Sequence, residues 1–322
     1  MTPCFSLLED DSLAVCVADA VFEPVGAWLP LHARPIGEVV ANGAARIHVA
    51  MDAGAEDDGA RDTGGSTPSL MRLGPVSAHA LDTDTIALRS PDARGLVSLA
   101  EDTARIGIVG DPDAGTTTAG LYCMLTLSAA LLLGRMGAAL VHAGAVADHE
   151  GRVWLLVGDT HAGKTTTSVA LADAGWRMLA DDQVVLRMGA QGWVVAEGWP
   201  RRAHLDAGYE TSAISGTRIP VDLRGRWGAQ VYRSAPVHAV ILPRVVAAAP
   251  TAARRVTGAD VFTALVRQSP WLMADRVAAP GISALLRSVA GRPGVALDLG
   301  ADSYGKGTML AELLTGHLCR GL

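Results

Sequence analysis

Hydrophobic and polar positions follow different patterns in the two parts of this chain. Up to about residue 115, apolar runs are short, broken by turns and without a long helical period. They predict β-strands at 13–17, 45–49, 85–88 and 105–109. Between the second and third lies 52–68, a polar, acidic segment with four glycines and no large apolar residue. The pattern predicts a β-rich N-terminal region at 1–115 with a mobile loop at 52–68.

From residue 116 onward, the pattern alternates between helices and strands. An uncharged run at 119–134 predicts a helix over 117–135, and its apolar part is too short to span a membrane, so we expect a buried core helix. An apolar run follows at 138–147, and Pro243 is expected to end a strand that begins at 237. Further strands are predicted at 153–157, 177–180, 183–186 and 295–299, and helices at 164–174, 258–268, 280–290 and 308–319. Such alternation is typical of an α/β sheet, here in a domain at 116–322.

Composition excludes several classes of protein. The hydrophobic content of 49% and charged content of 19% fit a folded chain, and the net charge of −6 argues against binding nucleic acid over the whole surface. Four scattered cysteines without a C-x-x-C motif argue against a disulfide framework or a zinc site. The N-terminus has acids at 9–11 and no basic start, which is unlike a secretory signal. A cytoplasmic protein without a membrane partner is expected.

Lysine is rare in this chain, because 25 of the 27 cations are arginines and only Lys164 and Lys306 are lysines. Lys164 belongs to a G-x-x-x-x-G-K-[ST] motif between a predicted buried strand and a predicted helix. Backbone N–H groups of such a loop wrap around phosphates, the lysine lies against the β- and γ-phosphates, and the next hydroxyl, on Thr165, binds Mg²⁺. The motif therefore predicts ATP and Mg²⁺ as ligands, and a chance glycine-rich turn is the alternative. The predicted nucleotide-binding residues are Gly158, Asp159, Thr160, His161, Ala162, Gly163, Lys164, Thr165 and Thr166.

The second lysine lies in a stretch that repeats only part of this motif. Residues 300–306 also read G-x-x-x-x-G-K, but Gly307 stands where the magnesium hydroxyl would be. Asp302 and Ser303 are typical of helix caps. We therefore interpret Lys306 as a surface residue.

Two acids and a histidine are further candidates for the site. Asp181 and Asp182 follow the predicted strand at 177–180, and adjacent carboxylates in an apolar sheet are costly unless a metal or partner offsets them. Beside a phosphate loop, Mg²⁺ can bind one of them, and the other can take a proton from an attacking hydroxyl. A turn pair that caps the next element is the alternative. His142 precedes the loop's strand and is either a core histidine or part of the site.

Together, the segments HAGAV at 142–146, VWLLVGDTHAGKTT at 153–166 and RMLADDQVVL at 177–186 resemble the HPr kinase/phosphorylase family. That family is related in fold to ATP-dependent phosphoenolpyruvate carboxykinase, so the resemblance implies a P-loop α/β core. It also implies Asp181 as general base towards a serine hydroxyl, Asp182 as a metal ligand with Thr165, and His142 as a supporting catalytic residue beside Lys164. Two departures are His161, where the family has a small residue, and Thr165 in place of serine.

The layout is similar to divergent family members associated with tailoring of ribosomal, lasso-type peptides. The resemblance thus implies an ATP-dependent serine kinase that acts on a peptide or protein, and in such families the protein often forms a homo-oligomer. A metabolite kinase or carboxykinase-like enzyme on the same core, and a nucleotide-binding regulator with little chemistry, are the alternatives.

A basic segment is the candidate for substrate binding. Residues 201–255 hold nine arginines and only three acidic residues. These arginines are either ordinary solvated side chains or a cationic rim for phosphates or an acidic peptide, since guanidinium groups bind both in a bidentate manner. The candidate contacts are Arg201, Arg202, Arg224 and Arg226.

Overall fold

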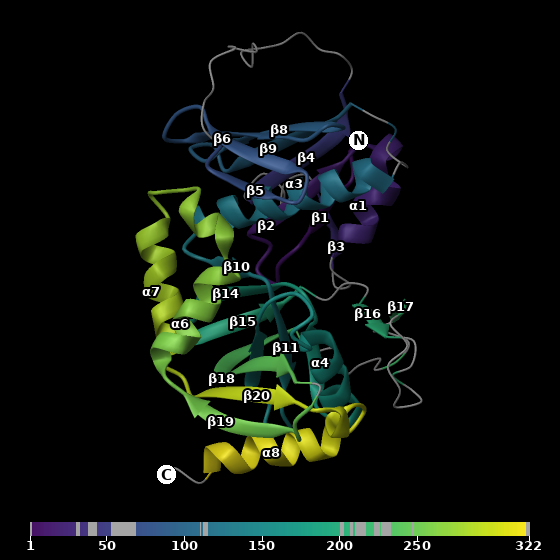
Figure 1. Cartoon of the computed structure of the whole chain (residues 1–322). Helices are drawn as coiled ribbons and strands as arrows, with labels where there is room; N and C mark the ends of the chain where they lie inside the picture. The colour runs from purple at the N-terminus through teal and green to yellow at the C-terminus, as the bar shows by residue number, and fades with distance from the viewer. Residues whose placement is uncertain are drawn as a thin grey trace. The chain divides into compact units, whose positions relative to one another are not determined.

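A computed structural model describes most of the chain and divides it into two compact units (Figure 1). One unit comprises Met1–Gly137 and Pro270–Pro280, and the other comprises Ala138–Ser269 and Gly281–Leu322. The division thus falls after Gly137 and not after residue 115, because the helix that follows residue 115 packs on the N-terminal sheet. The described residues are 2–29, 33–37, 44–52, 69–109, 111, 115–199, 203–206, 209, 217–221, 226, 233–246 and 248–319. Apart from Asp52, the predicted mobile loop lies outside them.

The first unit is built on a nine-stranded sheet in the order β3-β1-β2-β4-β9-β8-β7-β6-β5. Its strands are β1 (Cys4–Ser6), β2 (Leu13–Val17), β3 (Arg34–Ile36), β4 (Ala45–Met51), β5 (Met71–Leu73), β6 (Val76–Ala80), β7 (Thr85–Arg89), β8 (Ala93–Ser98) and β9 (Thr103–Ile108). The four predicted strands are confirmed as β2, β4, β7 and β9. Strand β8 gives no clear pattern in the sequence, because only Ala93 and Val97 are buried and Arg94 and Gly95 interrupt the apolar run.

Helix α3 (Gly115–Arg135) covers this sheet through contacts with β4, β8 and β9 and also packs on α1 (Phe22–Trp28). Its apolar side chains from Leu121 to Leu133 are largely buried, so the prediction of a core helix is confirmed. Arg135 ends the helix, where its guanidinium bonds to Asp275 at 2.5 Å and to Asp84 at 2.9 Å. None of the described helices has the length and hydropathy that a membrane span requires.

Cys4 and Cys16 form a disulfide, which the cysteine spacing does not predict. The two residues lie opposite each other because β1 and β2 pair in antiparallel register. The argument against disulfides is therefore wrong for this pair, since the geometry of a bridge depends on strand register and not on sequence spacing. Disulfides persist mainly in oxidising compartments, so this bridge does not support the predicted cytoplasmic location. That location stays a prediction.

The second unit contains a mixed sheet in the order β10-β14-β15-β18-β12-β11-β13, extended by β20 beside β18 and by β19 beside β20. Strands β12 and β18 pair in parallel, as do β18 and β20, and β13 is related to β12 through two antiparallel pairings with β11. Strands β12, β13, β18 and β20 therefore end at one edge of the sheet, where α/β proteins commonly bind ligands. The strands are β10 (Ala139–Val141), β11 (Ala143–Ala147), β12 (Val153–Val157), β13 (Arg177–Ala180), β14 (Val184–Met188), β15 (Val194–Gly198), β18 (Ser234–Val245), β19 (Ala252–Val256) and β20 (Gly294–Leu299). A separate two-stranded sheet pairs β16 (Ala203–Asp206) with β17 (Arg218–Val221).

Strand β18 runs through Pro243, so the expectation that this proline ends the strand is wrong. Strand β12 pairs with β18 only as far as Ile241, whereas β20 continues beside it to Val245. Beyond Ile241, the edge of β18 that faces β12 no longer pairs with that strand. Pro243, which has no backbone N–H group to donate, is tolerated at such an open edge.

The hairpin that leads into β12 is held by the carboxylate of Asp148, which is buried. Its oxygens accept bonds from the backbone N–H groups of Glu150 and Arg152, from the Arg152 side chain, and from the Trp154 indole at 3.0 Å. Burial works to raise the pKa of Asp148, but these donated bonds outweigh it, and the pKa lies below its ordinary value. The ionised carboxylate therefore fixes the start of β12.

In the described part of the second unit, the helices are α4 (Lys164–Asp173), α6 (Gly258–Arg267), α7 (Ala279–Ala290) and α8 (Gly307–Cys319). Helix α8 packs on α4 and β19 (Figure 1). At the contact, a Cβ atom on Gly307 would lie 1.7 Å from the carbonyl oxygen of Ala170 in α4. Close helix packing therefore explains why glycine and not a hydroxyl residue ends the second G-x-x-x-x-G-K stretch.

The residues around that stretch are also structural. Asp302 bonds to the backbone N–H of Thr251 at 3.0 Å and to its hydroxyl at 2.7 Å, so its expected role as a helix cap is wrong. The hydroxyl of Ser303 donates to the carbonyl of Gly300 at 2.8 Å. Lys306 is exposed, as expected.

The close packing of Gly307 gives a stability prediction. A Gly307→Ser variant should lose about 3 kcal/mol of unfolding free energy, because any Cβ overlaps the backbone of α4. Urea unfolding followed by tryptophan fluorescence measures the loss. Gly316→Ala is the matched control, since open space surrounds Gly316 in the same helix, and alanine should there gain up to about 1 kcal/mol. Equal stability of Gly307→Ser and the wild type would contradict the contact.

Candidate functional site

The loop between β12 and α4 holds two residues in the left-handed backbone region. His161 has a φ of 67°, and Gly163, directly before α4, has a φ of 98°. A Cβ on Gly163 would also lie 2.6 Å from Leu299, so this position requires glycine. A turn closed by the Ala162 N–H and the Asp159 carbonyl at 3.1 Å completes the loop. The strand–loop–helix arrangement predicted around the motif is thus present.

Several backbone N–H groups of this loop have no acceptor among the described residues. Within the described part of the chain, no acceptor is recorded for the N–H groups of Thr160, His161, Gly163 or Thr165. They lie at or just before the N-terminus of α4, where the helix dipole adds partial positive charge. Such amides and a helix N-terminus together can hold an anion.

Lys164 is buried within this loop, where it is only 7% exposed. Its ammonium group donates to the carbonyl of Gly158 at 2.7 Å and to that of Asp159 at 3.1 Å. These carbonyls compensate part of the cost of burying the charge. The lysine therefore supplies a fixed positive charge beside the amide donors.

The two aspartates after β13 have different partners. The hydroxyl of Thr165 donates to Asp181 Oδ2 at 3.4 Å, and Asp181 is only 7% exposed. Asp182 Oδ1 lies 3.0 Å from Nδ1 of His142, and both of these side chains are about one-third exposed. The structure thus brings His142, Lys164, Thr165 and both aspartates to one edge of the sheet.

Gln268 is a site residue that the sequence does not reveal. It is buried at the end of α6, and its side-chain amide donates to Asp159 Oδ1 at 2.9 Å. Its backbone carbonyl accepts the N–H of His142 at 2.9 Å. One glutamine therefore links the loop to the segment that carries the histidine. No sequence motif marks this position, because the link depends on contacts between distant segments.

Of the four predicted substrate arginines, only Arg226 belongs to the described residues. Arg201, Arg202 and Arg224 lie outside the described residues. Arg226 forms a bidentate pair with Asp173, at 3.1 and 2.8 Å, and its guanidinium also lies over the Tyr209 ring. Asp173 is the last residue of α4, at the end opposite Lys164.

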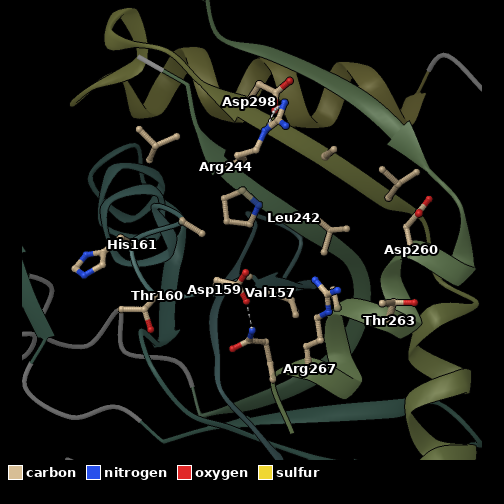
Figure 2. A pocket seen from close by; sticks show the side chains of 18 of the residues that line it. Val157, Asp159, Thr160, His161, Leu242, Arg244, Asp260, Thr263, Arg267 and Asp298 are labelled. Carbon is tan, nitrogen blue, oxygen red and sulfur yellow. Dashed lines mark hydrogen bonds and ion pairs between the residues drawn. The ribbon is translucent and has the colours of Figure 1, made fainter. Parts of the chain in front are cut away.

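A cavity of about 580 Å³ opens beside the first half of the loop (Figure 2). Two arginines of the basic segment, Arg244 and Arg254, line it, together with Arg267 from α6. Arg244 pairs with Asp298 at 2.9 Å. The other lining residues are Val157–Ala162, Leu242, Pro243, Val245, Val256, Asp260, Thr263, Ala264, Gln268, Ala296 and Asp298.

Fold and site together define a mixed α/β protein whose candidate site is a strand–loop–helix element. No protein-family model matches the chain, and no curated protein matches it. Among solved structures, the HPr(Ser) kinase/phosphatase from Coxiella burnetii matches 56% of this chain and 97% of its own, with 15% sequence identity and a TM-score of 0.33. A likeness this weak identifies no family, so function must be argued from the site.

The link between Asp159 and Gln268 gives a prediction for anion binding. Gln268→Glu places two carboxylates together at the loop and should weaken binding of inorganic triphosphate by about tenfold. The double variant Asp159→Asn/Gln268→Glu restores an amide–carboxylate pair with donor and acceptor exchanged, and its affinity should return at least to that of the wild type. Isothermal titration calorimetry measures both. A double variant as weak as Gln268→Glu would contradict a positioning role for this pair.

Proposed function

We propose that this protein is an ATP-dependent kinase that transfers the γ-phosphoryl group to a hydroxyl group. The observation that carries the proposal is the buried Lys164 among unpaired loop amides, next to a threonine hydroxyl that bonds to Asp181. This set of donors fits a polyphosphate chain. Hydroxyl and carboxylate oxygens are ligands that Mg²⁺ prefers, and Mg²⁺ commonly takes one or two protein ligands beside phosphates and water.

Each residue of the site has a role in this reaction. The loop amides and Lys164 bind the β- and γ-phosphates and stabilise the negative charge on the group in transfer. Thr165 and one aspartate would hold Mg²⁺, which would supply further charge neutralisation when bound. The other aspartate accepts the proton of the acceptor hydroxyl.

Contacts and burial favour Asp181 as the metal ligand and Asp182 as the general base, the reverse of what the sequence resemblance implies. Asp181 is buried and bonded to the hydroxyl of Thr165, the residue expected to bind the metal. The Asp182 side chain is 34% exposed and can be reached by an acceptor. Because His142 lies 3.0 Å from Asp182, it can orient this carboxylate.

The acceptor that the resemblance implies is a serine of a peptide or protein, such as a ribosomal peptide precursor. ATP labelled in its γ-phosphoryl group, incubated with Mg²⁺ and a pool of serine peptides, should label the peptides. Lys164→Ala should lower the rate by about a thousandfold, because the charge that stabilises the transferring group is lost. Lys306→Ala is the matched control and should leave the rate unchanged, since this lysine is exposed outside the loop.

Other results of this assay would change the proposal. Label in a parallel pool of hydroxyl-bearing metabolites, with none in the peptides, would make the protein a small-molecule kinase. ATP binding without transfer to either pool would favour a regulator.

Asparagine variants separate the two aspartate roles. Asp182→Asn should lower kcat by roughly a thousandfold but keep Mg²⁺-dependent binding of ATP, because only the proton acceptor is lost. Asp181→Asn should remove the effect of Mg²⁺ on ATP affinity. Titration of a fluorescent ATP analogue with and without Mg²⁺, beside the transfer assay, measures both. The opposite pattern would restore the roles that the sequence resemblance implies.

A further inference from the structure

We propose that the cavity beside the loop binds the nucleoside end of the nucleotide and that α6 provides the residues that hold it. This inference rests on the proposed function, because it assigns the remaining part of the same ligand. None of the catalytic roles above uses the side chains of α6 that line the cavity.

The sheet order places the cavity on the side of the loop that lies away from the two aspartates. Strand β12, which leads into the loop, lies between β11 and β18. The aspartates follow β13, on the β11 side, whereas the cavity is lined by the ends of β18 and β20, on the other side. The reacting phosphoryl group and the acceptor must meet at the aspartates. The other end of a nucleotide bound along the loop then extends towards the cavity.

The cavity has the size and apolar surface that a base and ribose need. Its volume of about 580 Å³ lies within the usual range for small-molecule sites. Its apolar lining comes from Leu242, Pro243, Val245, Val256, Ala264 and Ala296. Such a surface can pack against a planar base.

Polar side chains of α6 line one wall of the cavity. Asp260, Thr263 and Arg267 are spaced three and four residues apart, so they share one face of the helix, while Val261 and Leu265 are buried on another. Arg267 and Thr263 lie across the cavity from Arg244 and Asp298 in Figure 2. On this face the Thr263 hydroxyl can donate to a ring nitrogen or a ribose oxygen. The Asp260 carboxylate, whose Oδ2 accepts bonds from the Thr257 backbone N–H and hydroxyl, has its other oxygen to accept a bond from a ribose hydroxyl.

Arg267 provides an available cation at this wall. No ion-pair partner is recorded for it among the described residues, whereas Arg244 is already paired with Asp298. A guanidinium group can stack on a base or bind the phosphate nearest the ribose. Because Gln268 follows it directly and bonds to Asp159, the helix that contacts the nucleoside is joined to the loop that contacts the phosphates.

The test compares a ligand that has a nucleoside with one that lacks it. The full chain is titrated with a non-hydrolysable ATP analogue and with inorganic triphosphate, both with Mg²⁺. The wild type should bind the ATP analogue more tightly. Thr263→Trp fills the cavity and should weaken analogue binding by about tenfold or more, while triphosphate affinity changes by less than about twofold. Arg267→Ala should weaken the analogue by about tenfold.

Ala284→Trp, at an exposed position of α7 outside the cavity, is the control and should bind both ligands as the wild type does. The inference is overturned if Thr263→Trp binds the ATP analogue as tightly as the wild type, or if the wild type binds both ligands equally. Loss of both ligands in both variants would also overturn it, since these residues would then act on the phosphate loop. A wild type that binds neither ligand would overturn the proposed function itself.

Discussion

Hydrogen bonding of β12 on both edges is the constraint on which the candidate site depends. Strand β11 pairs with one edge, β18 with the other, and every side chain of β12 is buried. A shift of one residue would move the large Trp154 side chain, which packs against Trp176, to the opposite face of the sheet, so the sizes of the buried side chains specify the register. The end of β12 then fixes Gly158 and the N-terminus of α4, while β13 fixes the aspartates at the same edge. The loop between β12 and α4 thereby has a defined position.

Local sequence patterns predict the parts of the site whose chemistry lies within a few neighbouring residues. The motif that ends at Thr165 and the continuous apolar run of β12 reveal a strand, a loop and a helix, since each depends on spacing alone. Contacts between distant segments leave no such pattern. Three features depend on which strands and helices become neighbours in the fold. They are the bond of Gln268 to Asp159, the disulfide between Cys4 and Cys16, and the continuation of β18 through Pro243.

The aspartate pair shows the limit of a motif in another way. Sequence places Asp181 and Asp182 side by side, and in chemical terms they are identical. Their surroundings make them different, because one is buried against a hydroxyl and the other is partly exposed beside an imidazole. In the proposed reaction, the folded environment therefore decides which carboxylate holds the cation and which accepts the proton.

The contact between Gly307 and Ala170 has a consequence for biosynthesis. Helix α4, which begins with Lys164, is supported by α8, which the ribosome makes long after α4. A nascent chain that has completed the phosphate loop still lacks this support. Under the proposed function, nucleotide affinity should therefore develop only after α8 has been made and has packed on α4.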